Sequence, residues 1–330
     1  ELDVRLPFCL VEDDCSGDRL VLVPAYWWTH NLFALMRNES KFRSRDKRVA
    51  KVQEIEFSPF APDTAEEIIA GIGLIEGWMR AAGRDPSDAR GVGAARDATR
   101  AGAAKGAAGE AAADPELPAS GVENSGRPVV VRRPLRALAA YREMLLWYAG
   151  NVLLERLESL PPDADLAAAL ADLEGPRETA WENLGGQLVP LGAADELVAR
   201  AREGGIPDWR AMHAEYAALA AAYPEAKSRH ALACLRWLDE RSAPCGAERP
   251  AARVAADALL ALAAVSEKVA AEVLKTRAKD YDNAFRKATF RGEAEMRAVE
   301  GRVEDNPFVK RSAEDMARLR ERVRAVAARL

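Results

Sequence analysis

The residues best suited to chemistry lie in a basic segment that follows a cluster of aromatic side chains near the start of the chain. Arginine offers planar, bidentate donors to a phosphate or carboxylate group, and lysine offers a point charge. The segment therefore predicts a binding site for an anionic group. The alternative is a solvated face whose charges pair with nearby carboxylates. The candidate ligand-binding residues are Arg37, Asn38, Arg45, Lys47 and Arg48.

The aromatic residues just before this segment have a structural and a chemical interpretation. Trp27 and Trp28 are interpreted as core anchors rather than as stacking platforms for a ligand. His30 and Asn31 are candidates for acid–base and hydrogen-bonding roles, and the simpler interpretation of His30 is a packed histidine. Residues 24–63 are expected to join a helical region to a β-structure, with the aromatic half as the structural part.

A second stretch without helical periodicity, WENLGGQLVP at 181–190, carries paired glycines. Gly185 and Gly186 permit a tight backbone turn, and Trp181 is expected to anchor it. The stretch lacks the strand context and the further glycines of a nucleotide-binding loop. We therefore predict a structural turn here.

Several other chemistries lack a matching pattern. The four cysteines form no C-x-x-C pair and only three histidines accompany them, so we expect no metal site and no cofactor. No nucleophile motif of the G-x-S-x-G type stands in a credible context. The acidic residues between 280 and 295 show no spacing that fixes a metal. The sequence thus assigns no catalytic residue.

Bulk composition restricts the partners. The net charge of −5 argues against nucleic acid, and the chain has no apolar run near the roughly 18–20 residues that span a bilayer. A long, cysteine-poor chain indicates a reducing, cytoplasmic location. The chain begins at Glu1 without a signal peptide, which indicates that sequence precedes it.

The apolar spacing predicts a mainly α fold with a short N-terminal β segment. Residues 1–23 carry two strands, at 6–11 and 20–23, split by a polar turn, and such a pair needs another sheet for support. Residues 24–82 form the aromatic and basic junction with the first helices. Residues 83–130 are rich in alanine and glycine and are predicted to be a flexible insertion. Residues 131–330 are predicted to be a helical domain.

Helix boundaries follow from prolines, glycines and capping residues. Thr64 with Glu67, and Ser312 with Asp315, have the spacing of capping boxes at helix starts. Pro224 is expected to separate two helices. Residues 250–291 have no interior proline or glycine, which indicates a long hairpin arm or an oligomer contact. The predicted helices are 25–37, one after Thr64, one from Pro134, 164–173, 193–203, 208–223, 224–241, 250–291 and one from Ser312.

Six segments of the chain are distinctive in combination: PAYWWTHNLFALMRNESKFRSRDKRV, QEIEFSPFAPDTAEEI, YREMLLWYAGN, WENLGGQLVP, IPDWRAMHAEYAAL and NPFV. Together they resemble an uncharacterised bacterial family of large proteins, known only as a domain of unknown function. Its members carry an N-terminal left-handed parallel β-helix of hexapeptide repeats and a long helical C-terminal region. The resemblance extends from about Leu6 to Val309, and the alanine- and glycine-rich stretch after Gly83 looks like an insertion relative to the family pattern.

The resemblance implies that residues 1–23 are the end of a β-helix whose repeats lie upstream. That fold is similar to trimeric acyltransferases and sugar nucleotidyltransferases, which implies a homo-oligomer, a trimer formed through the β-helix. It also implies transferase chemistry on a nucleotide-sugar or acyl-donor substrate, a phosphorylated small molecule. In the related enzymes the active site lies on the β-helix between subunits, so this chain would not hold a complete one.

Two functions of different class follow. The first is the helical C-terminal region of a hexapeptide-repeat, transferase-like protein that binds an anionic substrate group. The second is a non-catalytic helical module for assembly or oligomerisation, organised by the helix predicted at 250–291 and the aromatic helix.

Overall fold

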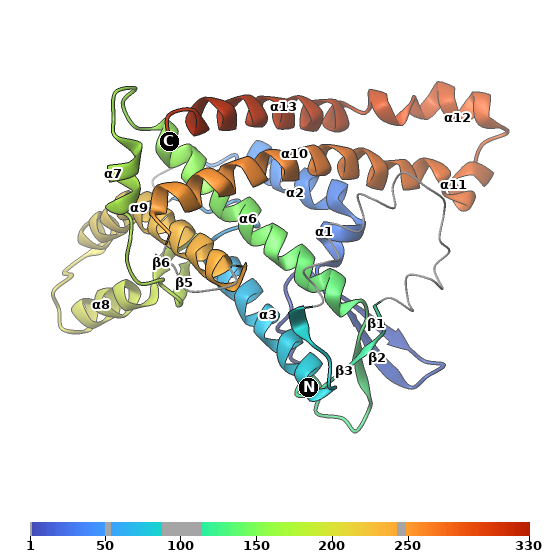
Figure 1. The fold of residues 1–330 in the computed structure, drawn as a ribbon, viewed down its shortest axis with the longest axis horizontal. Helices are drawn as coiled ribbons and strands as arrows, with labels where there is room; N and C mark the ends of the chain where they lie inside the picture. The colour runs from blue at the N-terminus through green and yellow to red at the C-terminus, as the bar shows by residue number, and fades with distance from the viewer. Residues whose placement is uncertain (1, 50–53, 88–113, 243–248) are drawn as a thin grey trace. The chain divides into compact units, whose positions relative to one another are not determined.

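The computed structural model describes residues 2–49, 54–87, 114–242 and 249–330. The protein is mainly helical, as the apolar spacing predicts (Figure 1). Its chain divides into two compact units. The first holds Glu1–Leu35 and Glu67–Met144, and the second holds Met36–Glu66 and Leu145–Leu330.

The first unit contains a mixed four-stranded sheet in the order β1-β2-β4-β3. β1 (Leu10–Asp14) and β2 (Arg19–Val23) form an antiparallel hairpin. β2 then pairs in parallel with β4 (Val129–Val131), and β4 pairs antiparallel with β3 (Leu117–Ala119). The N-terminal strands are therefore supported by strands from more than a hundred residues later. Whether an upstream β-helix also adjoins them stays a prediction.

Two of these strands correct the extent of the predicted insertion. β3 and the start of β4 lie within 83–130, which composition assigned to a flexible segment. Val129 and Val131 are buried, and β-branched side chains favour strands. Residues 88–113 of the predicted insertion lie outside the described residues.

The helices of the first unit come from α1 (Tyr26–His30), the start of α2 (Leu32–Arg45), most of α3 (Pro62–Ala81) and the first half of α6 (Pro134–Glu158). Ile72, Ile75 and Leu138 are fully buried. The hydroxyl of Tyr141 donates to the carbonyl of Pro7 at 2.8 Å and ties α6 to the N-terminal segment. The single helix predicted at 25–37 is two helices in the structure, α1 and α2, and α2 continues into the basic segment as far as Arg45.

The second unit is helical and contains a β-hairpin. Its strands, β5 (Trp181–Leu184) and β6 (Gln187–Pro190), pair antiparallel. The helices wholly within this unit are α7 (Leu166–Ala171), α8 (Leu191–Arg202), α9 (Trp209–Ser242), α10 (Ala251–Asp282), α11 (Ala284–Ala288), α12 (Glu293–Glu300) and α13 (Pro307–Ala327), with a 3-10 turn η2 (Val303–Asp305) before α13.

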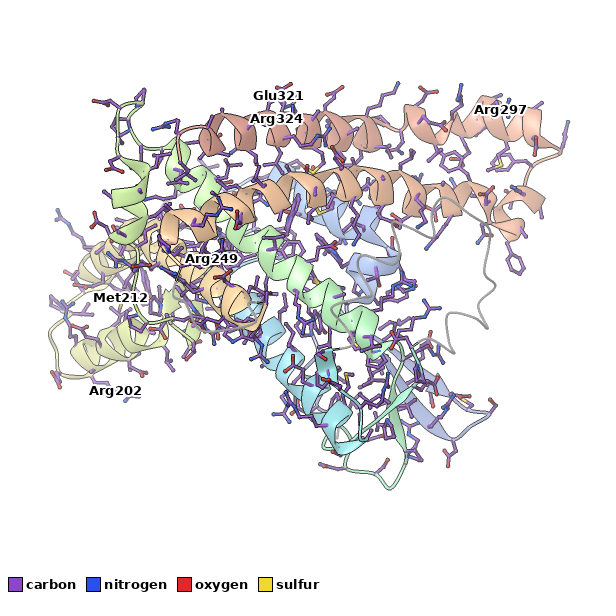
Figure 2. All side chains as sticks on the ribbon, in the orientation of Figure 1. Arg202, Met212, Arg249, Arg297, Glu321 and Arg324 are labelled. Atoms are coloured by element: carbon purple, nitrogen blue, oxygen red, sulfur yellow. The ribbon has the colours of Figure 1, made fainter. Side chains whose placement is uncertain are left out.

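α10 and α13 lie side by side and antiparallel (Figure 1). The buried residues of α13 recur every three and four positions, the spacing of a coiled-coil seam: Val309, Ser312, Met316, Leu319, Val323 and Val326. Charged residues such as Glu321 and Arg324, labelled in Figure 2, are exposed. The long helix predicted at 250–291 is therefore the arm of a hairpin within this chain, and Asn283 ends α10 earlier than predicted.

Other helix boundaries also differ from the predictions. Pro224 lies inside α9 and does not separate two helices. α3 begins at Pro62, so Thr64 and Glu67 do not mark its start. α13 begins at Pro307, because the Asn306 side chain accepts from the backbone N–H groups of Phe308 and Val309. An asparagine cap followed by a proline supplies the same start signal without a capping box.

None of the helices in the described part of the chain has the length and apolar character needed to cross a membrane.

Candidate functional site

Three of the cations in the predicted anion-binding segment fall on one face of α2. Arg37, Lys41 and Arg45 are spaced four residues apart, which places them one above the next along a helix. We call these three residues the cationic stripe. The positive charge of Arg37, the partial loss of solvent and the positive charge of Arg45 together lower the pKa of Lys41. This shift is the electrostatic signature of cations close enough to repel one another.

The other predicted ligand-binding residues lie outside the stripe. Arg48 forms a two-pronged ion pair with Asp46, with Nε–Oδ1 and Nη2–Oδ2 distances of 3.0 Å. This hydrogen bonding raises the pKa of Arg48, and the Asp46 carboxylate balances its charge. Asn38 and Lys47 are exposed. The segment thus combines the two interpretations left open by the sequence. It contains ion pairs, Arg48–Asp46 and, within α2, Arg43–Glu39 at 3.4 Å, and it also contains the row of like charges in the cationic stripe.

The two neighbouring tryptophans have different environments. Trp28 is buried, and its indole N–H donates to Oε1 of Glu143 at 2.8 Å, as expected of a core anchor. Trp27 is 37% exposed and contacts Tyr26 edge-to-face, so its prediction as a core anchor is wrong. The reason is geometric, because adjacent residues of a helix point about 100° apart and only one of them can face the core.

His30 is held as a packed histidine. Arg133 can only donate, so its Nη1 group 3.1 Å from Nε2 makes Nε2 the acceptor. Nδ1 then carries the proton and donates to the Thr29 hydroxyl at 2.6 Å. The ring also stacks on Tyr26 with an interplanar angle of 7°. These contacts favour the structural interpretation over acid–base catalysis.

The paired glycines form the turn that the sequence predicts. Gly185 and Gly186 have φ angles of 67° and 103°, and they connect β5 to β6 in a two-residue loop. An added Cβ on Gly186 would approach the Ile55 side chain to 3.2 Å. Trp181, at the start of β5, packs against the buried cluster of Ala61, Leu188 and Tyr223. The structure thus gives Gly185, Gly186 and Trp181 structural positions, in a turn and in the packing beside it.

A further set of polar side chains lies along one face of α9 in the second unit. Tyr223, Lys227, His230 and Cys234 follow one another at spacings of four, three and four residues. The Trp181 ring meets both Tyr223 and His230 edge-on, at centroid distances of 6.3 and 5.5 Å. This face therefore carries two groups of polar side chains, the first at Tyr223 and Lys227 and the second at His230 and Cys234. The Trp181 ring is a neighbour of both groups.

The second of these groups centres on the imidazole of His230, which is only 1% exposed. Nδ1 lies 2.9 Å from the Tyr148 hydroxyl, and Nε2 lies 2.9 Å from Oε1 of Glu66. The Arg177 Nε atom is 3.1 Å from the same carboxylate oxygen. Cys234, with no exposed surface, places its sulfur 3.7 and 3.8 Å from the two ring nitrogens.

A cysteine, a histidine and a carboxylate suggest a thiol nucleophile, but the environment of Cys234 argues against it. Burial raises the pKa of the Cys234 thiol far above its ordinary range, and the nearby Glu66 carboxylate acts in the same direction. Reactive cysteines are instead partly exposed and lie in electropositive surroundings that lower the pKa. The group is therefore not built for nucleophilic attack on a dissolved substrate.

Sequence reasoning did not single out Glu66, Tyr148, Arg177, His230 or Cys234 as site residues. His230 and Cys234 are separated by one helical turn, and this spacing was the one signal available. Glu66 lies 164 residues before His230 along the chain, so no local motif connects them.

Comparison with known proteins gives one informative relative. The chain is 34% identical over 334 residues to an uncharacterised protein of Treponema pallidum (strain Nichols). The alignment includes 97% of this chain and spans 42% of the length of that relative. No family model matches the chain, and no solved structure matches it.

Proposed function

We propose that this chain is the helical region of a hexapeptide-repeat, transferase-like protein, and that its cationic stripe binds the anionic part of a nucleotide-sugar or acyl-donor substrate. The six segments that resemble such a family support the assignment. The Treponema protein is consistent only with the part of the proposal that makes this chain a region of a longer protein, because the shared segment spans 42% of its length.

The cationic stripe is the observation that carries the ligand-binding part of the proposal. Like charges four residues apart on a helix repel one another, and this repulsion lowers the pKa of Lys41 here. A bound phosphate or pyrophosphate would turn this repulsion into attraction and would accept charge-assisted hydrogen bonds from both arginines. The stripe therefore has the chemistry of a phosphate contact.

The transfer step itself would belong to the β-helix. The thiol of Cys234 is buried and protonated, and His30 and His230 are engaged by neighbouring side chains. The resemblance puts catalysis between subunits of a trimer, and this homo-oligomer is part of the proposal. β1 is at one edge of the sheet, and the edge of a sheet is where a further strand can pair.

The alternative of an assembly module built on residues 250–291 has less support. An oligomer contact along that helix would need an apolar face left uncovered by the chain itself. The buried residues of α10 are instead covered within the chain, largely by α13, which packs along it.

Ligand-induced thermal shift tests the proposal with pyrophosphate, a uridine diphosphate sugar and an acyl-coenzyme A as probes, ideally on the full-length protein. We expect stabilisation by at least one probe, and about tenfold weaker binding for Lys41→Ala and Arg45→Ala, the effect of removing one charged hydrogen bond. Lys275→Ala is the control, an exposed lysine of α10 outside the basic segment. The proposal fails if no probe stabilises the protein, or if Lys41→Ala and Lys275→Ala bind the probe alike.

A further inference from the structure

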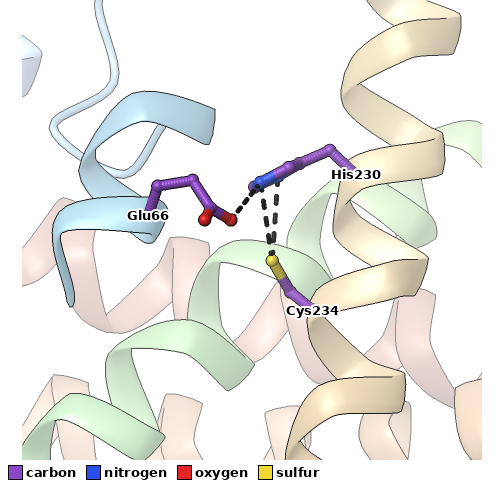
Figure 3. Close-up of side chains that lie close together, drawn as sticks. All are labelled: Glu66, His230 and Cys234. Atoms are coloured by element: carbon purple, nitrogen blue, oxygen red, sulfur yellow. Dashed lines mark hydrogen bonds and ion pairs between the residues drawn. The ribbon is translucent and has the colours of Figure 1, made fainter. Parts of the chain in front are cut away.

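Three side chains with different metal-binding atoms converge in the second unit. The ligand atoms of Glu66, His230 and Cys234 all lie within 4.8 Å of one another, and among the described residues this is the group in which such atoms gather (Figure 3). His230 and Cys234 are buried, and Glu66 keeps 14% of its side chain exposed. A buried set of one oxygen, one nitrogen and one sulfur is a typical donor combination for zinc-like ions.

We propose that Glu66, His230 and Cys234 form a binding site for a divalent transition-metal ion of the Zn²⁺ type. The proposal concerns residues apart from the cationic stripe and does not depend on the proposed function.

The spacing of the donor atoms is close to what a tetrahedral ion requires. Zinc bonds of about 2.0–2.1 Å to nitrogen and oxygen and about 2.3 Å to sulfur imply N···O and N···S separations of about 3.3 and 3.6 Å. The Nε2–Oε1 and Nε2–Sγ distances are 2.9 and 3.8 Å. These two pairs thus need to change by only a few tenths of an ångström, and the Glu66 oxygen and Sγ, which lie within 4.8 Å of each other, have to come to about 3.6 Å.

The sulfur also has to swing towards one ring nitrogen. Sγ is almost equally far from Nδ1 and Nε2, so it lies against the ring rather than in line with a nitrogen lone pair (Figure 3). Rotation of the Cys234 side chain about χ1 moves it along the face of α9 that His230 shares. Residues one helical turn apart are suited to this chelation, as in the paired histidines of helical zinc sites.

The surroundings of His230 suit a metal ligand. The Tyr148 hydroxyl holds Nδ1 at 2.9 Å, and a hydroxyl can either donate to this nitrogen or accept from it. The imidazole can therefore carry its proton on Nε2 in the metal-free protein and on Nδ1 in the metal-bound one. A hydrogen bond to the second ring nitrogen is the usual support of a metal-ligating histidine.

Binding exchanges one proton for the ion. Glu66 binds as a carboxylate and His230 as a neutral imidazole, and the thiol of Cys234 releases its proton to solvent as the metal–sulfur bond forms. Three protein ligands leave a fourth position of a tetrahedral ion for water or a small anion. The four cysteines gave no zinc pattern in the sequence because the site uses only one of them.

Titration of the reduced, metal-free chain with Co²⁺ tests the proposal, because a Co²⁺–thiolate bond has a charge-transfer absorption that water-bound Co²⁺ lacks. We expect this absorption to saturate at one ion per chain and to be displaced by Zn²⁺. Cys234→Ser should abolish it. His230→Gln and Glu66→Gln should weaken binding by tenfold or more, and Tyr148→Phe by about 10- to 100-fold.

Matched controls separate this site from other thiols and histidines. Cys15→Ser removes an exposed thiol, and His213→Gln removes an exposed histidine of α9, and neither should change the titration. Cys234→Ala replaces the serine variant if a buried hydroxyl impairs folding, which circular dichroism reports. Absence of the absorption in the unaltered chain overturns the proposal, and so does an unchanged absorption in either Cys234 variant.

Discussion

The hydroxyl of Tyr223 donates to Oε2 of Glu56 at 2.7 Å, and the ammonium group of Lys227 reaches the same oxygen from one turn further along α9. Glu56 also accepts from the backbone N–H of Ser58 at 2.9 Å. Burial by itself would raise the pKa of Glu56. The charge and hydrogen bond of Lys227, with the bonds from Tyr223 and Ser58, outweigh it and lower the pKa. A buried carboxylate is thus kept ionised by its partners.

Glu56→Gln should destabilise the protein by about 3 kcal/mol at neutral pH, because it leaves the largely buried ammonium of Lys227 without its carboxylate. Urea-induced unfolding of the two proteins measures the difference. Glu225→Gln is the control, since the Glu225–Arg229 pair is about half exposed and should be worth less than about 1 kcal/mol.

The same pair predicts a pH dependence. The pKa of Glu56 is lower in the folded chain than in the unfolded chain, where it is about 4.3. Its contribution is therefore complete above that value and is lost as the pH falls through the lowered folded pKa. The stability gap between the unaltered chain and Glu56→Gln should close in acid. A gap that stays constant from neutral pH to acid contradicts this assignment.

The seam between α10 and its neighbours allows a test with two leucines of one helix. Leu262 is fully buried, and Leu260 is 59% exposed. Leu262→Ala should cost about 2–5 kcal/mol, because it removes buried apolar surface and leaves a cavity. Leu260→Ala should change the unfolding free energy by less than about 0.5 kcal/mol. Similar losses at both positions would show that Leu260 is covered in solution.

The parts of the fold set by local apolar spacing were predictable, and those set by distant contacts were not. The helix from Pro134 was read from a repeating apolar face whose residues are buried in the structure. β3 and β4 were missed because they lie in or beside the alanine- and glycine-rich stretch. Their three-residue strands gain their partners from each other and from β2, over a hundred residues earlier.

Pro224 shows how tertiary packing overrides a local signal. A proline inside a helix removes one hydrogen bond and crowds the preceding turn, so a helix boundary was the better prediction. In α9, the buried residues Tyr223 and His230, seven residues apart, continue one face through the proline, and the Ser228 hydroxyl donates to the carbonyl of Pro224 at 2.7 Å. Burial on both sides offsets the local cost.

The two candidate sites differ in the same way: the spacing of the cationic stripe is local, and the cluster around His230 depends on distant contacts. Arg37 and Arg45 lie on the same helix, and their spacing was visible once α2 was known to continue through the basic segment. The cluster around His230 draws on Glu66, Tyr148 and Arg177 from three other segments. Nothing in the sequence near His230 states which residues will face it.

The geometry of the β5–β6 turn predicts that substitutions at its two adjacent glycines affect stability differently. Gly186 has φ 103°, and a Cβ there would meet Ile55, so Gly186→Ala should cost about 1–3 kcal/mol. Gly185 has φ 67°, in the left-handed region that asparagine tolerates, and Asn-Gly is a favoured pair in such turns. Gly185→Asn should therefore leave the thermal midpoint nearly unchanged. Equal destabilisation by both substitutions would contradict this turn geometry.

Arg177 should lower the affinity of the proposed site for a metal ion. Its Nε atom lies 3.1 Å from Oε1 of Glu66, so a bound dication would share its carboxylate with a fixed positive charge. Arg177→Gln removes this repulsion and should tighten Co²⁺ binding by on the order of tenfold. The metal-free variant should be less stable, because Glu66 loses its cation and Trp237 loses the guanidinium 5.9 Å from its ring centroid.

Arg229→Gln is the control, an arginine of α9 that pairs with Glu225 and should leave the affinity for Co²⁺ unchanged. Unchanged or weaker Co²⁺ binding in Arg177→Gln would mean that the ion does not bind beside Glu66. Tighter Co²⁺ binding together with a lower melting temperature of the metal-free variant would show that Glu66 is a metal ligand and not only the partner of Arg177 in an ion pair.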